Sequence, residues 1–276
     1  MHVGGPHGDT PHGMIAVDFD GTLLRSDRTV SDRTNRALVG AAEAGWLVVG
    51  ATGRPLPLAE LVARSVPSMG FVACMNGAAI LDIETDDVVL DTVVDVDAVL
   101  EAGRLIRSRI PSAGLAVDLT DGSQMWEDGF GHLVPLRPLG ECDDDVLVAL
   151  AASGHTDVRK LIAFSDEIEA HALLDAIDEL LGPEHGVAHS GLPFVEIGAP
   201  GVSKASALAW LADDRGVEVG NCVAFGDEIN DHEMLVWAGT GVAMGNADDA
   251  TKARADVVTA ANDDDGIAIY VEELLR

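Results

Sequence analysis

Short apolar segments alternate with amphipathic segments in both terminal parts of the chain, and this alternation limits the folds that it can adopt. The short segments predict strands at residues 15–18, 46–51, 71–75, 222–225, 241–244 and 256–259. The segments of helical period predict helices at residues 31–44, 55–65, 203–215, 231–237, 248–254 and 266–275. Because parallel strands need long connections, usually helices, this order predicts an α/β fold: a parallel sheet with helices on both faces.

The middle of the chain has a different pattern, which indicates a second domain. A hairpin is expected at residues 79–82 and 88–93, followed by helices at 98–110, 143–152 and 167–181 and by strands at 115–119, 159–164 and near Ala188 and Val195. We therefore expect residues 14–82 and 191–276 to form the α/β core and residues 83–190 an inserted α+β domain. Residues 1–13 carry three His among Gly and Pro; a disordered leader before a true start near Met14 is favoured over a metal site.

The charge balance of the chain excludes some functions. Its 276 residues include 17 Lys and Arg against 47 Asp and Glu, so the formal net charge is −30. Nucleic acids and anionic membranes are bound mainly through basic side chains, and we therefore expect neither as a partner. The apolar runs are far shorter than the roughly 20 residues of a membrane-spanning helix. Three cysteines without a Cys-x-x-Cys pair favour a reducing, cytoplasmic location.

The segment after the first predicted strand carries two carboxylates, Asp18 and Asp20, followed by Gly21. In parallel sheets, ligands bind beyond the carboxyl ends of the strands. Two carboxylates two positions apart on an extended segment point to the same side. Such a pair can hold Mg²⁺ through oxygen atoms while one carboxylate attacks phosphorus. A surface turn, or the Asp-x-Asp motif of glycosyltransferases, would also fit this short pattern.

Two further segments offer groups that bind anions. Thr52 and Gly53 follow the second predicted strand and precede a helix, where a hydroxyl and free N–H groups make an anion site; an ordinary N-cap Thr is the alternative. Lys204 lies near the start of a helix, where the helix dipole slightly disfavours a cation. Because the chain has only three Lys, we expect Lys204 to neutralise an anion. A solvated surface position is the alternative.

The last of these segments lies between a predicted strand and a helix, and it contains Asp227, Asn230 and Asp231. The two carboxylates flank a turn and can face a metal, and the amide can donate to a phosphate oxygen. A cluster of N-capping acids is the alternative. All four segments fall at a strand end or a helix start, in an order that allows them to converge.

In this combination, the sequence resembles the haloacid dehalogenase-like (HAD) hydrolases, and more narrowly their Cof-type, sugar-phosphatase-like branch. The resemblance runs from Met14 to the C-terminus, and its motifs come in family order at residues 18–24, 51–54, 76–78, 201–204, 225–235, 243–247 and 262–266. It implies a Rossmann-like core, and the insert matches the family's large α+β cap in size and position without a diagnostic motif. Ala205 stands where the family often has Gly, a minor departure.

The resemblance also implies a function for each residue of the site. Asp18 would be the nucleophile and Asp20 the general acid and base. The implied Mg²⁺ ligands are Asp18, Asp20 through its backbone carbonyl, and Asp227, with Asp231 in support. The implied phosphoryl-binding residues are Phe19, Thr52, Gly53, Lys204 and Asn230. Arg54 matches the family as well, and both substrate contact and scaffolding remain open for it.

These implied functions describe a Mg²⁺-dependent phosphatase of small phosphorylated metabolites, either sugar phosphates or cofactor and nucleotide phosphates. A phosphomutase of the same fold and a non-catalytic module that binds a phosphate ligand are the alternatives. We expect a cytoplasmic monomer or homodimer. For Trp126 and His132, in the long polar stretch of the insert, a core-packed Trp and an exposed loop are favoured over a substrate-facing surface.

Overall fold

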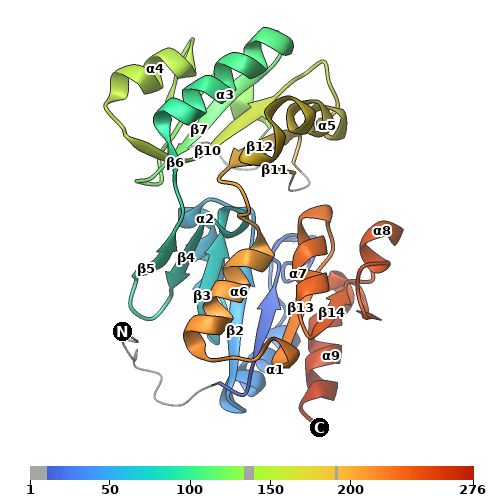
Figure 1. Cartoon of the computed structure of the whole chain (residues 1–276). Helices are drawn as coiled ribbons and strands as arrows, with labels where there is room; N and C mark the ends of the chain where they lie inside the picture. Colours follow the sequence, from blue (N-terminus) through green and yellow to red (C-terminus); the bar gives the residue numbers. More distant parts are fainter. Residues whose placement is uncertain (1–10, 134–139, 190–191) are drawn as a thin grey trace. The chain divides into compact units, whose positions relative to one another are not determined.

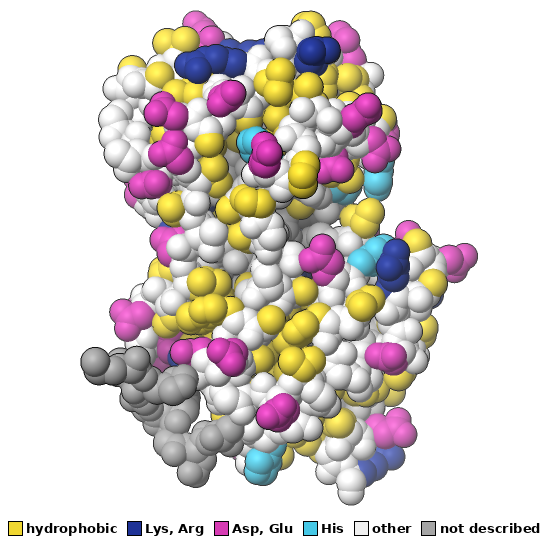
Figure 2. Space-filling model, viewed as in Figure 1, with side chains coloured by type: hydrophobic (Ala, Val, Ile, Leu, Met, Phe, Trp, Pro, Cys, Tyr) yellow, Lys and Arg dark blue, Asp and Glu magenta, His cyan; other side chains and the backbone are white. Residues whose placement is uncertain are grey.

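The computed structural model describes residues 11–133, 140–189 and 192–276 (Figure 1). The chain divides into two compact units. The first comprises the described residues up to Leu90 together with Ser203–Arg276, and the second is Asp91–Val202. Among the described residues, no helix is long and apolar enough to cross a membrane. On the face drawn in Figure 2, acidic side chains are spread over both units and the basic ones form no continuous stripe.

The first unit is built on an eight-stranded sheet with the order β15-β14-β13-β1-β2-β3-β4-β5. Its strands are β1 (Gly13–Val17), β2 (Trp46–Ala51), β3 (Met69–Cys74), β4 (Ala79–Asp82), β5 (Val88–Asp91), β13 (Cys222–Gly226), β14 (Thr240–Ala243) and β15 (Val257–Val258). The strands from β15 to β3 pair in parallel, and β4 is antiparallel to β3. The predicted α/β fold with a Rossmann-like parallel sheet is therefore confirmed.

Helices cover both faces of this sheet, as the crossover connections require. They are α1 (Asp32–Glu43), α2 (Leu56–Ala63), α6 (Lys204–Arg215), α7 (His232–Trp237), α8 (Asp249–Lys252) and α9 (Gly266–Leu274). Met14 and Ala16 share a buried apolar cluster with α6 and α7. Ile15 and Val17 alternate with them and therefore point to the opposite face, where α1 packs against α9.

The second unit has a sheet of its own. The strand order is β11-β12-β10-β7-β8-β9, with β6 paired to β10. The strands are β6 (Val94–Asp95), β7 (Gly114–Leu119), β8 (Gln124–Trp126), β9 (Gly140–Cys142), β10 (Asp157–Phe164), β11 (Gly186–Ala188) and β12 (Phe194–Gly198). One face buries an apolar core against α3 (Val96–Arg109), α4 (Val146–Ser153) and α5 (Ala170–Leu181). The other face carries a smaller cluster that includes Trp126 and Phe130.

The structure corrects the predicted boundaries of the insert. The expected division at residues 83–190 becomes Asp91–Val202. β5 belongs to the core sheet because it adds to the edge next to β4. At the other end, β12 pairs with both β10 and β11, which keeps the chain in the second unit through Gly198.

Two residues of the expected leader, His12 and Gly13, are ordered parts of the first unit. Gly13 is the first residue of β1 and pairs with Trp46, and the backbone N–H of His12 donates to Gly45 O at 2.9 Å. Disorder through residue 13 is therefore wrong for these two residues, because the central strand begins one residue before Met14. The rest of the prediction, residues 1–10 with His2 and His7, lies outside the described residues.

Candidate active site

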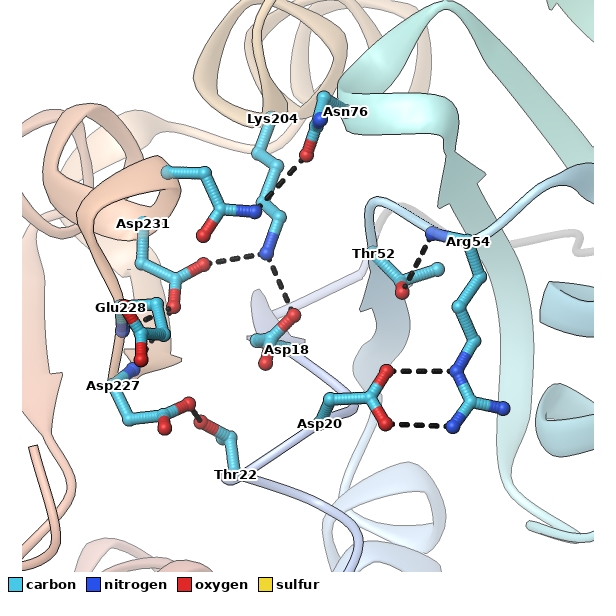
Figure 3. Close-up of polar contacts among 11 residues, drawn as sticks. Asp18, Asp20, Thr22, Thr52, Arg54, Asn76, Lys204, Asp227, Glu228 and Asp231 are labelled. Atoms are coloured by element: carbon cyan, nitrogen blue, oxygen red, sulfur yellow. Dashed lines mark hydrogen bonds and ion pairs between the residues drawn. The ribbon is translucent and has the colours of Figure 1, made fainter. Parts of the chain in front are cut away.

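Three central strands of the first unit end at the same level, and this register brings the predicted segments together. Val17 pairs with Phe225 on one side and with Gly50 on the other. Asp18 therefore follows β1 at the edge where β13 leads to Asp227 and β2 leads to Thr52 (Figure 3).

Lys204 joins two of these segments. Its Nζ atom donates to Asp18 Oδ1 and to Asp231 Oδ1, both at 2.6 Å, and the side chain is only 1% exposed. Lys204 is the first residue of α6, after the N-cap Ser203, whose hydroxyl forms a capping box with Ser206. The two carboxylates offset the unfavourable position of a cation at a helix N-terminus. The surface alternative for Lys204 is therefore wrong.

Asp231 acts as the scaffold of the acidic turn. Its Oδ2 atom accepts from the backbone N–H groups of Asp227 at 2.9 Å and Glu228 at 3.1 Å, while its other oxygen binds Lys204. The side chain is fully buried. Asp227 is oriented separately, because the Thr22 hydroxyl donates to its Oδ1 atom at 2.7 Å.

The carboxylates of Asp18, Asp227 and Asp231 form a group that could hold a metal ion. One oxygen of each lies within 4.8 Å of the others. Three carboxylates against one ammonium leave two negative charges uncompensated at a largely buried place. Hard oxygen donors of this kind suit Mg²⁺. The residues present therefore fit a divalent cation.

Burial and mutual repulsion change the acidity of these groups. Burial raises the pKa of Asp18 well above its usual value; Lys204 opposes this, whereas Asp231 and Asp227 add to it. Burial also raises the pKa of Asp227 to about 7, against the hydrogen bond from Thr22. Although burial by itself would lower the pKa of Lys204, Asp18 and Asp231 raise it above its usual value, so this side chain stays charged.

Asp20 does not share the partners of Asp18. Its carboxylate binds Arg54, as Figure 3 shows, and is 61% exposed. The segment that carries both carboxylates is not extended as expected, because β1 ends at Val17 and the chain then turns, with Leu23 N–H donating to Asp18 O at 3.0 Å. The Phe19 side chain is fully buried, so only its backbone can contact a substrate.

Asn230 and Thr52 lie in the same region as the acidic cluster. The Asn230 amide donates to Asn76 Oδ1 at 3.0 Å, and Asn76 N–H donates to Thr52 O at 3.0 Å. Thr52 is buried and its Oγ1 atom accepts from Arg54 N–H at 3.2 Å. The functions predicted for Asn230, Thr52 and Gly53 stay predictions.

The comparison with known families decides what kind of protein carries this arrangement. The sequence profile of the haloacid dehalogenase-like hydrolases matches residues 15–271. The chain belongs to this family. Within the family, this HAD hydrolase is a Cof-like member, as its sequence motifs predicted.

Several named relatives of this HAD hydrolase are phosphatases. It is 31% identical to the pyridoxal phosphate phosphatase of Escherichia coli (strain K12), over 94% of this chain and 97% of that protein. It is 30% identical to a 5-amino-6-(5-phospho-D-ribitylamino)uracil phosphatase of Bacillus subtilis (strain 168), over 92% of each. A solved HAD-like hydrolase from B. subtilis superposes with a TM-score of 0.81 at 25% identity, covering 95% of this chain and 99% of that one. The chain is thus a HAD-type phosphatase, a phosphoric monoester hydrolase.

Several residues around the site of this HAD phosphatase were given no function by sequence reasoning. Thr22 orients Asp227, and Asn76 orients Asn230. Asn246 Nδ2 donates to Gly21 O at 2.9 Å and to Asp227 Oδ2 at 3.3 Å. The Asn-Gly pair at residues 76–77 is a local sequence signal for a turn. Asn76 adopts a left-handed conformation there (φ 54°), of the kind that Asn tolerates.

The metal-free protein is expected to lose stability as the pH rises from about 4 to about 7. The pKa values of Asp18 and Asp227 are raised in the folded state above their unfolded value near 4, so the folded protein holds more protons in this window. Their contribution is fully present below about pH 4 and is lost as the pH rises through the folded pKa. Carboxylates with a lowered pKa, such as Asp248 and Asp265, titrate below this window.

Urea unfolding in EDTA at about pH 5 and about pH 8 measures this effect. The midpoint should be lower at the higher pH, and added Mg²⁺ should raise it most there, because the cation binds the ionised carboxylates. Replacing Asp227 with Asn should flatten the pH dependence. A metal-free midpoint that increases across this range would contradict the expectation.

Proposed function

We propose that this protein is a Mg²⁺-dependent phosphatase in which Asp18 attacks the phosphorus of a small phosphorylated metabolite. The arrangement of Lys204 between Asp18 and Asp231, next to Asp227, carries the proposal. Asp18, Asp227 and the Asp20 carbonyl would hold the metal, with Asp231 in support. When bound, Mg²⁺ would offset the charge of the carboxylates and of the phosphoryl oxygens.

Donor groups remain for the phosphoryl oxygens. An ammonium has three N–H donors, and Lys204 uses two for the carboxylates, which leaves the third for the substrate. The Asn230 amide gives one of its two N–H groups to Asn76. The Thr52 hydroxyl accepts from Arg54 and can still donate its own hydrogen. Together with the backbone N–H groups of Phe19 and Gly53, these donors would orient the phosphorus toward Asp18.

The reaction would proceed in two steps. A carboxylate oxygen of Asp18 bonds to phosphorus while the bond to the leaving oxygen breaks, and Asp20 in its protonated form gives its proton to that oxygen. Asp20, now a carboxylate, then takes a proton from a water molecule that attacks the phosphorus of the aspartyl-phosphate. Asp18 is released together with inorganic phosphate.

Turnover of phosphate esters in the presence of Mg²⁺ tests this function. The purified protein should release inorganic phosphate from 4-nitrophenyl phosphate, and EDTA should lower the rate by more than about a hundredfold, because a metal in such a site contributes several kcal/mol. Added Mg²⁺ should restore the rate. Stoichiometric transfer of the phosphoryl group to a second sugar, without release of phosphate, would indicate a phosphomutase. No turnover of any compound in a broad panel of phosphate esters would indicate a binding module.

The substrate class is part of the proposal. We infer sugar phosphates or cofactor and nucleotide phosphates, since named relatives act on pyridoxal phosphate and on a ribitylaminouracil phosphate. A screen should therefore include both compounds and a set of hexose phosphates, ranked by kcat/KM. A cytoplasmic location and a monomer or homodimer remain predictions, and sedimentation of the purified protein would measure the second.

A further inference from the structure

Arg54 holds the Asp20 carboxylate with two parallel hydrogen bonds. Nε donates to Oδ2 at 2.7 Å and Nη2 donates to Oδ1 at 2.6 Å (Figure 3). This pairing engages both carboxylate oxygens and therefore fixes the plane of the carboxylate as well as its position. Among the described residues, no other side chain forms a hydrogen bond or an ion pair with Asp20.

The fold determines where the Arg54 guanidinium lies. The Arg54 backbone N–H donates to Thr52 Oγ1 at 3.2 Å, and its carbonyl accepts from Met75 N–H at 3.0 Å. Pro55 follows directly and is the N-cap of α2. The Arg54 side chain is 23% exposed and the Asp20 side chain 61%. The guanidinium is thus the anchored partner, and the more exposed carboxylate takes its direction from it.

The contact between Arg54 and Asp20 orients the Asp20 carboxylate rather than stabilising the fold. Ion pairs between groups as exposed as Asp20 add little to stability, since water screens the charges. A general acid, by contrast, must lie within hydrogen-bond reach of the oxygen that it protonates, and small displacements are costly in rate. A side chain with this exposure and a single partner depends on that partner for its placement.

We propose that Arg54 is a positioning residue for Asp20, holding this carboxyl group in reach of the leaving oxygen and later of the attacking water. The inference rests on the proposed function. Arg54 forms and breaks no covalent bond and keeps its own protons throughout. The proton that Asp20 gives to the leaving oxygen returns to Asp20 from the water molecule that attacks phosphorus.

Esters with different leaving groups test this inference. Departure of a nitrophenolate needs little protonation, whereas departure of an alkoxide depends on the general acid. In Arg54→Met, kcat/KM should therefore fall by about tenfold to a hundredfold for an alkyl phosphate, which is part of the usual contribution of a general acid. For 4-nitrophenyl phosphate it should change less than about threefold. Arg54→Lys should recover only part of the loss, because an ammonium cannot form the paired contact.

A double-mutant cycle with Asp20→Asn separates positioning from other effects. If Arg54 acts through Asp20, adding Arg54→Met to Asp20→Asn should cost little further kcat/KM for the alkyl ester. Arg64→Met is the matched control: Arg64 pairs with Glu60 and Asp86 on α2 and the loop after β4, and it has no bond to the site. Its kcat/KM should equal that of the wild type for both esters.

Three results would overturn the inference. Equal losses for both esters with a raised KM would indicate that Arg54 contacts the substrate itself. Additive losses in the double mutant would show that it acts independently of Asp20. Unchanged rates in Arg54→Met would reduce the contact to a surface ion pair. If the wild-type protein with Mg²⁺ turns over neither ester, the proposed function fails instead, so the two failures are distinguishable.

Discussion

Replacing Asp18 with Asn is expected to lower turnover by at least about a thousandfold and to leave the metal-free protein no less stable than the wild type. The activity is lost because an amide cannot attack phosphorus in place of the carboxylate. Stability is retained because the substitution removes one of three neighbouring negative charges. Burial already raises the pKa of Asp18 well above its usual value, so its ionised form is costly at neutral pH. An amide oxygen can still accept the hydrogen bond from Lys204.

Rate and urea unfolding of the same preparation in EDTA test both halves of this prediction. Asp249→Asn is the matched control, since Asp249 is an exposed carboxylate in the first turn of α8. Its rate and its free energy of unfolding should stay within about 0.5 kcal/mol of the wild type. An Asp18→Asn variant with wild-type turnover would make the nucleophile assignment wrong. A variant that unfolds far more easily would show that the Asp18 charge stabilises the metal-free fold.

The acidic cluster illustrates what the sequence could predict. Asp18, Lys204 and Asp227 each stand at a strand end or a helix start, and parallel strands bring such positions to one edge. The register of β1 with β2 and β13 places the ends of these three strands at the same level. The family motifs added the functions of these residues, which local patterns alone left open.

The direction of side chains in loops could not be predicted from the sequence pattern. The pattern predicted an extended segment through Asp18 and Asp20, but the strand stops at Val17, so the relative direction of the two side chains does not follow from their spacing. Neither the Arg54 pairing nor the bridge from Asn246 to Asp227 follows from spacing, because each depends on how two distant loops pack.

The predicted boundaries of the insert differ from those of the structure for a related reason. β5 and β12 are short strands, and the sheet that each one joins is decided by its neighbours rather than by its own sequence. β8 and β9 lie at the two ends of a stretch that reads as polar loop, and both are defined by pairing near the edge of their sheet. In contrast, the predicted core packing of Trp126 is confirmed, because a large aromatic ring gains much from burial.

Replacing Lys204 with Met is expected to destabilise the protein by about 3–5 kcal/mol at neutral pH, the usual cost of removing one partner from a buried ion pair. Met fills a similar volume without the charge, so Asp18 and Asp231 would stay buried with only like charges nearby. Because the pKa of Asp18 is raised by burial and this carboxyl can take up a proton as the pH falls, the loss should be smaller at about pH 5 than at about pH 8. Turnover should fall by at least about a thousandfold, since the cation that faces the phosphoryl group is lost.

Lys252, one of the other two Lys of the chain, provides the control. Lys252 lies in the last turn of α8 and forms no ion pair among the described residues, so Lys252→Met makes the same chemical change without removing a bond to the acidic cluster and should keep both stability and rate. Combining Lys204→Met with Asp231→Asn should recover part of the lost stability but none of the activity, because it relieves the buried charge without restoring the cation. An unfolding midpoint for Lys204→Met equal to that of the wild type would mean that water or protons already compensate these carboxylates. In that case, the charge balance that assigns a divalent cation to this site would have to be revised.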